Sequence, residues 1–318
     1  MRVSAALVLV ALAAGPAVAG GVVKQDAPKP MFKAGVNLVM VTVVIQNKNG
    51  EPVKGLTRDD FQLFDSGEAR AIADFHAEMS PVRVAVLMDL SGSMEVSTKM
   101  ADARAAARQL LSWLDPDRDH AALFGFDTSL VEVVPFSAPM RELDHALDLL
   151  KPYGSTSLYD AMAATGRRLA SLDGPRRAVV AITDGADTSS EMRPADVANL
   201  ASGIDVPLYV MAVVLPMDNP SSHGSAVDSA SARILAGPLS ALARATGGQL
   251  FVASAPAHQS IAARRIVSDL RSQYLLTFEP APGGKPGFHP LSITTRNKDL
   301  VVRTRNGYVV DTTSKYHN

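Results

Sequence analysis

Three hydrophobic runs with almost no polar side chains constrain the fold of this chain more than any other feature. The runs are Val82–Met88, Ala178–Ile182 and Val206–Val214. A strand that is apolar on both faces is typical of a parallel sheet that helices cover on both sides. Segments with helical periodicity alternate with these runs. The sequence therefore predicts an α/β fold with a doubly wound, mostly parallel sheet.

The other elements of the predicted α/β unit are less pronounced. Further strands are expected at 121–126, 131–134 and 249–252, and helices near 100–114, 140–150, 158–172, 194–202 and 235–246. A last helix near 260–272 is expected to link this unit to the strands that follow. In the first helix, apolar residues recur every three or four positions, which indicates one buried face. Trp113 stands among these residues, so we expect its ring to pack in the core.

Short runs of β type lie toward both ends of the chain. Residues 36–45 are rich in β-branched side chains and are followed by the turn sequence Asn47–Gly50. Comparable runs occupy 61–64, 71–75, 273–278, 290–295 and 300–304. Because the two ends of a domain commonly lie close together, we predict that these segments pair into one smaller β-sandwich unit.

The first residues have the pattern of a signal peptide. A positive start at Arg2 precedes an apolar run, and Ala17 and Ala19 are the small residues that a signal peptidase recognises. We expect cleavage after Ala19 and export to the periplasm or the extracellular space. The apolar run is too short to span a bilayer and no later run is long enough, so no membrane span is expected after cleavage.

These patterns give the expected order of domains along the chain. Residues 1–19 are the signal peptide and 20–35 a flexible leader. The first part of the β unit covers 36–79, and the α/β domain covers 80–258. A linking helix and the second part of the β unit occupy 259–310, and a tail occupies 311–318.

The composition excludes several classes of function. The chain has no cysteine, which rules out disulfides, thiolate metal ligands and a thiol nucleophile. Its formal net charge is −1 and its basic residues are spread along the sequence, so no nucleic acid is expected as a partner. The histidines never stand four positions apart, which argues against a zinc site on a helix.

Polar residues gather in three segments next to predicted strands and helices. Asp89–Ser93 follows the first apolar run, Gly154–Thr156 precedes a helix, and Thr183–Gly185 follows the second run. In a doubly wound sheet the ligand site lies outside the carboxyl ends of the strands, where these segments are expected to meet. Two carboxylates and three hydroxyls suit a hard cation, Mg²⁺, with Mn²⁺ or Ca²⁺ as alternatives. The predicted metal ligands are Asp89, Ser91, Ser93, Thr156 and Asp184.

Two further acids belong to the same region of the predicted sheet. Asp127 follows the strand at 121–126, and Asp160 lies in the first turn of the helix at 158–172. Both are candidates for residues that hold the metal ligands in place. The alternatives are a solvated turn for Asp127 and an acid that stabilises the start of a helix for Asp160.

The pattern Asp-x-Ser-x-Ser, then Thr, then Asp resembles the metal-ion-dependent adhesion site (MIDAS) of von Willebrand factor type A domains. The chain also resembles the secreted bacterial family of acidobacterial type that is related to these domains. That similarity rests on the segments Gly55–Phe61, Phe64–Gly67, Leu270–Leu276 and Arg305–Tyr308. The resemblance implies a Rossmann-like fold and metal-dependent contact between proteins. It also implies that Ser91, Ser93 and Thr156 bind the metal directly, and that Asp89 and Asp184 bind it directly or through water.

Such a site indicates binding rather than catalysis, so we expect the chain not to be an enzyme. Carboxylates neutralised by a cation are poor bases, and Ser91–Ser93 lacks the Gly-x-Ser-x-Gly pattern of a serine hydrolase. We expect an adhesion-type module whose open metal position accepts a Glu or Asp carboxylate of a partner protein. The alternatives are a metal-assisted hydrolase and a structural periplasmic or surface protein whose metal braces the fold.

A long polar stretch at 216–233 follows the third apolar run. It is longer than most strand-to-helix connections, and such loops are commonly functional or disordered. Because it leaves the carboxyl end of a strand, we predict that it lies beside the metal and contacts the partner. The alternative is a surface insertion without a role.

Overall fold

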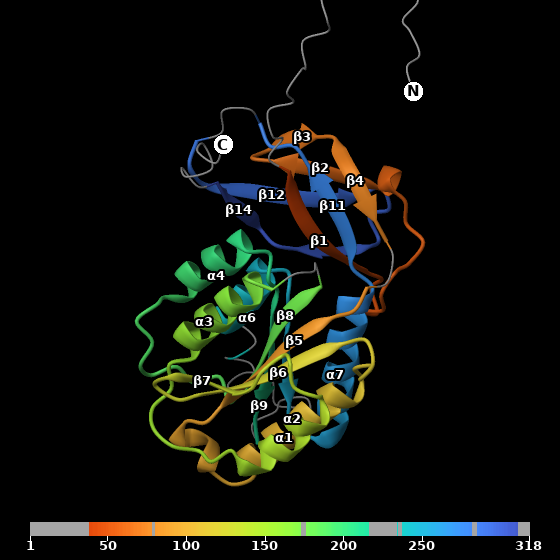
Figure 1. Cartoon of the computed structure of the whole chain (residues 1–318). Helices are drawn as coiled ribbons and strands as arrows, with labels where there is room; N and C mark the ends of the chain where they lie inside the picture. Colours follow the sequence, from red (N-terminus) through yellow and green to blue (C-terminus); the bar gives the residue numbers. More distant parts are fainter. Residues whose placement is uncertain are drawn as a thin grey trace, which may run out of the picture. The chain divides into compact units, whose positions relative to one another are not determined.

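The computed structural model describes residues 38–77, 80–172, 176–215, 234, 237–281 and 285–310. The predicted signal peptide at 1–19, leader at 20–35, tail at 311–318 and polar loop at 216–233 lie outside these residues. The described part contains an α/β unit built on one large sheet and a β unit built on two smaller sheets (Figure 1).

The large sheet has six strands in the order β10-β9-β8-β5-β6-β7. Their bounds are β5 Arg83–Asp89, β6 His120–Phe126, β7 Leu130–Val134, β8 Arg177–Thr183, β9 Leu208–Val213 and β10 Leu250–Ala253. All neighbours in the sheet run parallel except β6 and β7, which pair antiparallel. The predicted fold class, a mostly parallel α/β sheet, is therefore confirmed.

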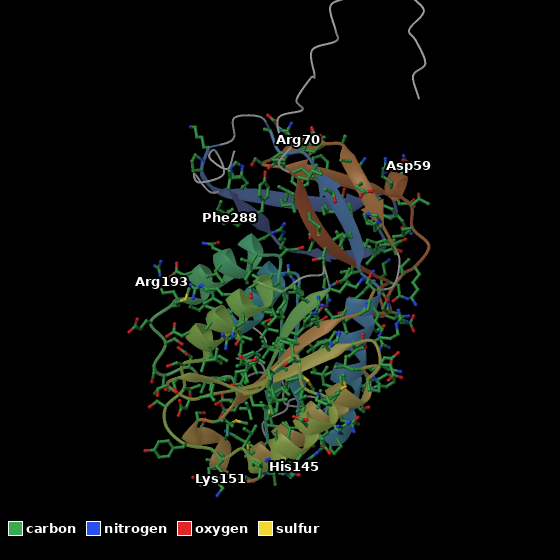
Figure 2. The ribbon with its side chains drawn as sticks, viewed as in Figure 1. Asp59, Arg70, His145, Lys151, Arg193 and Phe288 are labelled. Carbon is green, nitrogen blue, oxygen red and sulfur yellow. The ribbon has the colours of Figure 1, made fainter. Side chains whose placement is uncertain are left out.

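Helices cover both faces of this sheet. They are α1 Lys99–Ser112, α2 Arg141–Leu149, α3 Leu158–Ala170, α4 Pro194–Gly203, α6 Pro238–Ala245 and α7 Pro256–Arg271, and the short 3₁₀ helix η2 covers Gly92–Glu95. Figure 1 shows α1, α2 and α7 on one face and α3, α4 and α6 on the other. Exposed polar side chains such as His145 on α2 and Arg193 before α4 point outward from these layers (Figure 2).

The central strand β5 contributes to both hydrophobic cores. Successive side chains of a strand point to opposite faces of its sheet. Val84, Val86 and Met88 therefore pack with residues of α1, α2 and α7. Ala85 and Leu87 pack with residues of α3, α4 and α6 on the other face. This double burial explains why the strand is apolar at nearly every position.

The prediction that Trp113 packs in the core is wrong. Trp113 caps the carboxyl end of α1, and its side chain is 40% exposed, whereas Leu110 and Leu114 are buried. Leu110 lies on the buried face of α1, and Leu114 packs in the same core just after the helix has ended, whereas Trp113 stands at the helix end between them. Sequence proximity to the stripe was therefore not enough to bury the ring.

The β unit consists of two antiparallel sheets of four strands, in the orders β13-β1-β11-β4 and β14-β12-β2-β3. The strands from the first part of the chain are β1 Val39–Gln46, β2 Phe61–Asp65, β3 Glu68–Arg70 and β4 Ile72–His76, and the 3₁₀ helix η1 covers Arg58–Asp60. Those from the last part are β11 Tyr274–Phe278, β12 Gly287–Thr295, β13 Val301–Thr304 and β14 Gly307–Val310. Strand β1 pairs with β11 and β13, and β2 pairs with β12. The two segments thus form one β-sandwich, as the sequence predicts.

Buried charges join the β unit to the ends of two helices. Asp269, near the end of α7, accepts a hydrogen bond of 2.8 Å from Gln46 Nε2 and pairs with Arg303. Arg305 donates to the backbone carbonyls of Ser202 in α4 and Met40 in β1. Helices of a doubly wound sheet end near the amino-terminal edge of its strands. The β unit therefore contacts that edge, and the carboxyl ends of the strands lie at the opposite edge.

None of the helices in the described ranges combines the length and the hydrophobicity that crossing a membrane requires.

Candidate functional site

The five predicted ligands lie at the carboxyl edge of the large sheet. Asp89 is the last residue of β5, and Asp184 follows β8, the strand paired with β5 in parallel register. Ser91 precedes η2 and Ser93 lies within it, while Thr156 lies in the loop before α3. Parallel strands that end side by side place the two carboxylates near each other.

Asp89 is fully buried, and both of its oxygens accept hydrogen bonds. Oδ1 accepts from the backbone N–H of Ser91 at 2.9 Å, and Oδ2 accepts from the hydroxyl of Thr183 at 2.5 Å. Burial raises the pKa of Asp89, and the nearby charge of Asp184 acts in the same direction, although the hydrogen bonds from Ser91 and Thr183 oppose it. A buried carboxylate with a second carboxylate nearby favours a cation beside it.

The two serines are held by the backbone turn into η2. Ser91 is the N-cap residue of η2, yet its side chain makes no capping hydrogen bond to the helix. Its hydroxyl instead lies 3.0 Å from the hydroxyl of Ser93. A serine at this position commonly binds the free N–H groups of the helix. Here both hydroxyls are turned to each other, as a shared ligand would require.

Backbone hydrogen bonds connect the Thr156 loop to both other loops. The Gly92 N–H donates to the Gly154 carbonyl at 2.9 Å. The Thr156 carbonyl accepts from the N–H of Thr188 at 2.9 Å. Thr156 is buried, and its N–H donates to the hydroxyl of Thr188 at 3.1 Å. The fold therefore brings the three predicted segments together.

Glycine is required at the turn of this loop. Gly154 has φ of +85°, a backbone conformation that other residues seldom adopt. A Cβ at this position would also lie 3.3 Å from Asp127 Oδ2. The loop that carries Thr156 thus fits closely against the residue that follows β6.

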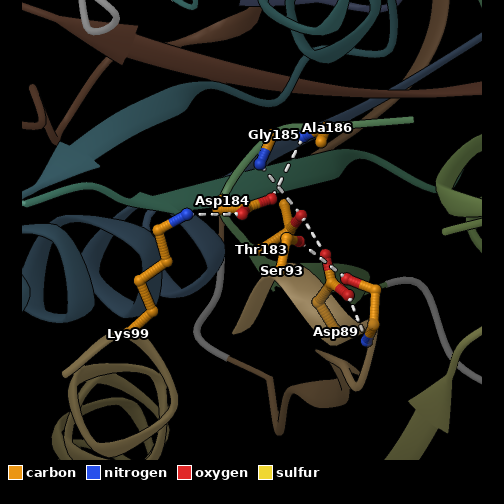
Figure 3. A network of polar contacts seen from close by, with 8 residues as sticks. Asp89, Ser93, Lys99, Thr183, Asp184, Gly185 and Ala186 are labelled. Carbon is orange, nitrogen blue, oxygen red and sulfur yellow. Dashed lines mark hydrogen bonds and ion pairs between the residues drawn. The ribbon is translucent and has the colours of Figure 1, made fainter. Parts of the chain in front are cut away.

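Lys99 is a site residue that the sequence reasoning missed. Its Nζ donates to Asp184 Oδ2 at 2.8 Å, and Asp184 Oδ1 accepts from the Ala186 N–H at 3.2 Å (Figure 3). The side chains of Lys99 and Asp184 are only 19% and 7% exposed. The signal that was available is a lone basic residue at the start of the helix that follows the serines.

Asp127 supports the Thr156 loop through its backbone. Its carbonyl accepts a hydrogen bond from the Ser157 N–H at 2.8 Å. Its Oδ1 accepts from the N–H and the hydroxyl of Ser129 at 2.8 and 3.0 Å. Desolvation acts to raise the pKa of Asp127, but these hydrogen bonds lower it overall. The carboxylate of Asp127 therefore stabilises the turn at Asp127–Ser129, and its backbone carbonyl holds the loop that carries Thr156.

Asp160 orders the loop that follows Asp184. Its Oδ2 accepts from the N–H of Glu191 at 2.8 Å, and its Oδ1 accepts from the N–H of Met192 at 2.9 Å. Both oxygens are thus engaged by backbone groups some distance along the chain from the predicted ligands. Asp160 supports the site only through the loop that it fixes.

The side chains at this edge fit a hard divalent cation by their chemistry. In the described ranges, no three side chains among His, Cys, Asp and Glu gather into a metal-binding group. A cation here would need the hydroxyls of Ser91, Ser93 and Thr156 in addition to the two carboxylates. All-oxygen ligation of this kind is what Mg²⁺, Mn²⁺ and Ca²⁺ prefer. The ammonium of Lys99 on Asp184 shows that this carboxylate already accepts a cationic partner.

Comparison with protein families supports an assignment for this region. A family model described as von Willebrand factor type A domain matches residues 84–197. All five predicted ligands lie within this range. Comparison with curated proteins gave no match.

Several solved structures are similar in fold. The conserved hypothetical protein BatB from Bacteroides thetaiotaomicron shares 18% identity, over 60% of this chain and 100% of that one, with a TM-score of 0.48. A von Willebrand factor type A protein from Catenulispora acidiphila shares 15% identity, over 88% and 76% of the two chains, with a TM-score of 0.48. The PilB minor pilin from Streptococcus sanguinis shares 14%, over 61% and 63%, with a TM-score of 0.44. These similarities concern the fold alone.

Proposed function

Since the chain contains a von Willebrand factor type A domain, we propose that it is an exported binding protein that holds a divalent cation and, through it, a partner protein. Domains of this family mediate contacts between proteins, which supports the general class of function. The finer proposal is that Ser91, Ser93 and Thr156 bind Mg²⁺ directly, and that Asp89 and Asp184 bind it directly or through water.

One observation supports this proposal most strongly: three loops that are far apart in sequence meet at one edge of the large sheet. The predicted ligands that they carry are all carboxylates or hydroxyls, so every ligand atom is an oxygen. The Gly92–Gly154 and Thr188–Thr156 hydrogen bonds fix two of these contacts. The Thr183–Asp89 hydrogen bond fixes the third. Loops held in this way present their oxygens without a large rearrangement, which favours binding because less entropy is lost.

When bound, the cation supplies a positive charge that attracts a carboxylate of the partner. The protein side chains hold the cation and leave one position for the incoming Glu or Asp. Such a contact is strongest where water is excluded around it. Asp89, Ser91 and Thr156 are all buried, so the floor of the site is already shielded from solvent.

The arrangement favours binding over hydrolysis. Both oxygens of Asp89 accept hydrogen bonds, and both of Asp184 do so as well. In the described part of the chain, the hydrogen bonds of this site include no histidine, the most common general base. A metal-assisted hydrolase remains the second candidate, because the proposed cation would bind water when no partner is present.

The experiment that tests this function is a quantitative binding assay on the mature chain, residues 20–318. The chain is immobilised and exposed to exported proteins of the source cell in Mg²⁺ or in EDTA. We expect one protein to be retained in Mg²⁺, released by EDTA, and lost in the Ser93→Ala variant. The control is Ser112→Ala, which alters an exposed serine at the end of α1 and should retain the partner.

The outcome distinguishes the candidates. Retention that is equal in Mg²⁺ and EDTA would contradict a metal-dependent contact. A bound metal with no retained protein would favour the structural alternative. Breakdown of a captured protein in Mg²⁺ alone would favour the hydrolase.

A further inference from the structure

Lys99 occupies a position that its helix alone does not favour. It is the first residue of α1, where the aligned peptide dipoles carry a partial positive charge. A cation is destabilising there unless an anion compensates for it. The carboxylate of Asp184, 2.8 Å from Lys99 Nζ, is that anion. The contact bridges two segments that are 85 residues apart in sequence.

The backbone between η2 and α1 directs Lys99 toward the site. Ser97, in this connection, adopts φ of +56°, which is uncommon for a residue other than glycine. Thr98 follows as the N-cap, and its hydroxyl donates to the Asp102 carboxylate at 2.7 Å and makes no capping bond to a backbone N–H of the helix. The chain thus turns sharply after the serines, and this turn brings the first side chain of α1 to Asp184.

From this contact we infer that Lys99 is an internal cation that competes with the divalent metal for Asp184 and thereby sets the metal affinity of the site. The inference rests on the proposed metal site. In the metal-free protein, Lys99 neutralises one of the two carboxylates at the sheet edge. A divalent cation that uses Asp184 must displace the ammonium or bind beside it, and both routes weaken binding. Asp184 Oδ2 is the atom for which they compete.

The ion pair between Lys99 and Asp184 also explains how the site keeps its arrangement when no metal is bound. Two carboxylates near each other with no cation between them repel each other. The ion pair is only slightly exposed, so solvent screens it less than it screens a surface pair. Lys99 therefore keeps the Asp184 loop in place for an incoming cation.

The test is titration of the EDTA-treated mature chain with Mn²⁺ by calorimetry. Lys99→Met keeps the length of the side chain and removes its charge, so we expect it to bind Mn²⁺ roughly tenfold more tightly than the wild type. Lys99→Arg retains the charge and should bind as weakly as the wild type. The matched control is Lys48→Met, because Lys48 pairs with Asp299 at 2.6 Å in the β unit. This control should leave the affinity unchanged.

A second readout does not depend on calorimetry. Without metal, Lys99→Met should have a lower Tm than the wild type, because Asp184 has lost its counter-charge. Saturating Mg²⁺ should then raise its Tm by more than it raises that of the wild type. Equal Mn²⁺ affinity in the wild type and Lys99→Met would overturn the role of Lys99 and leave the metal site standing. Absence of Mn²⁺ binding in both would overturn the metal site and this inference together.

Discussion

The Thr183 hydroxyl donates a hydrogen bond of 2.5 Å to Asp89 Oδ2, so that the last residues of two adjacent strands are joined by their side chains. Thr183 and Asp89 are both fully buried. The same Thr183 hydroxyl accepts a hydrogen bond from the Gly185 N–H at 3.0 Å, which orders the turn that carries Asp184. One threonine therefore fixes the orientation of one predicted ligand and the backbone of another.

The first prediction concerns this threonine. Thr183→Val removes the hydroxyl and leaves a buried carboxylate oxygen without its donor, which costs about 1–3 kcal/mol of unfolding free energy. Thr183→Ser retains the hydroxyl and should lose much less. Urea unfolding of the metal-free proteins measures the difference. A valine variant as stable as the serine variant would show that the bond contributes nothing.

A second prediction follows from Gly154. Gly154→Ala places a Cβ in a backbone conformation with φ of +85° and 3.3 Å from Asp127 Oδ2. The Thr156 loop must shift, so Mg²⁺ affinity should fall while circular dichroism remains unchanged. Gly55→Ala is the control, because Gly55 has φ of +80° but no atom within 4 Å of the added Cβ. Equal losses of affinity in the two variants would contradict a local effect at the site.

The third prediction is that the contribution of Asp119 to the stability of the fold depends on pH. Asp119 immediately precedes β6. Desolvation acts to raise the pKa of Asp119, but hydrogen bonds from Val82 and Asp115 and the Arg271 guanidinium lower it overall. A carboxyl whose pKa is lower in the folded state stabilises the fold above its ordinary value of 3.8, and this stability is lost as the pH falls through the lowered pKa.

Asp119→Asn should therefore be less stable than the wild type at neutral pH, and the difference should shrink in acid. Unfolding curves at a series of pH values measure this. A stability difference that does not change with pH would show that the charge of Asp119 is irrelevant.

The fourth prediction concerns the β unit. Strand β1 pairs with β11 and β13, and its side chains Val41, Val43 and Ile45 are fully buried. Removal of residues 273–310 deletes both neighbours and exposes these side chains. We expect the truncated chain to aggregate or to bind a hydrophobic dye such as anilinonaphthalene sulfonate. A soluble, cooperatively unfolding fragment with no dye signal would contradict the packing.

Much of the fold could be predicted because burial on both faces leaves a clear mark on the sequence. The runs that became β5, β8 and β9 are apolar at nearly every position for that reason. The positions of Asp89 and Asp184 could be predicted because parallel strands end at one sheet edge. The place of a residue that ends or directly follows a buried strand can therefore be predicted from the sequence.

The parts that could not be predicted depend on turns and on long-range pairing. Lys99 contacts Asp184 after a turn in which Ser97 has φ of +56°, and no local sequence pattern predicts that conformation. The pairing of Asp269 with Arg303 depends on how α7 meets the β unit. Asp160 was a candidate support for the ligands, but its partners, the N–H groups of Glu191 and Met192, belong to a loop without a recognisable motif.

The most direct test of the central claim is calorimetric titration of Mg²⁺ into the metal-free chain, residues 20–318, and into its Asp184→Ala variant. We predict a single site in the wild type and no detectable binding in the variant, with the circular dichroism spectra of the two proteins superimposable. The alanine removes one of two carboxylates and leaves the Lys99 ammonium near the vacated position, so both effects oppose the cation. Unchanged Mg²⁺ binding by Asp184→Ala would contradict the proposed site.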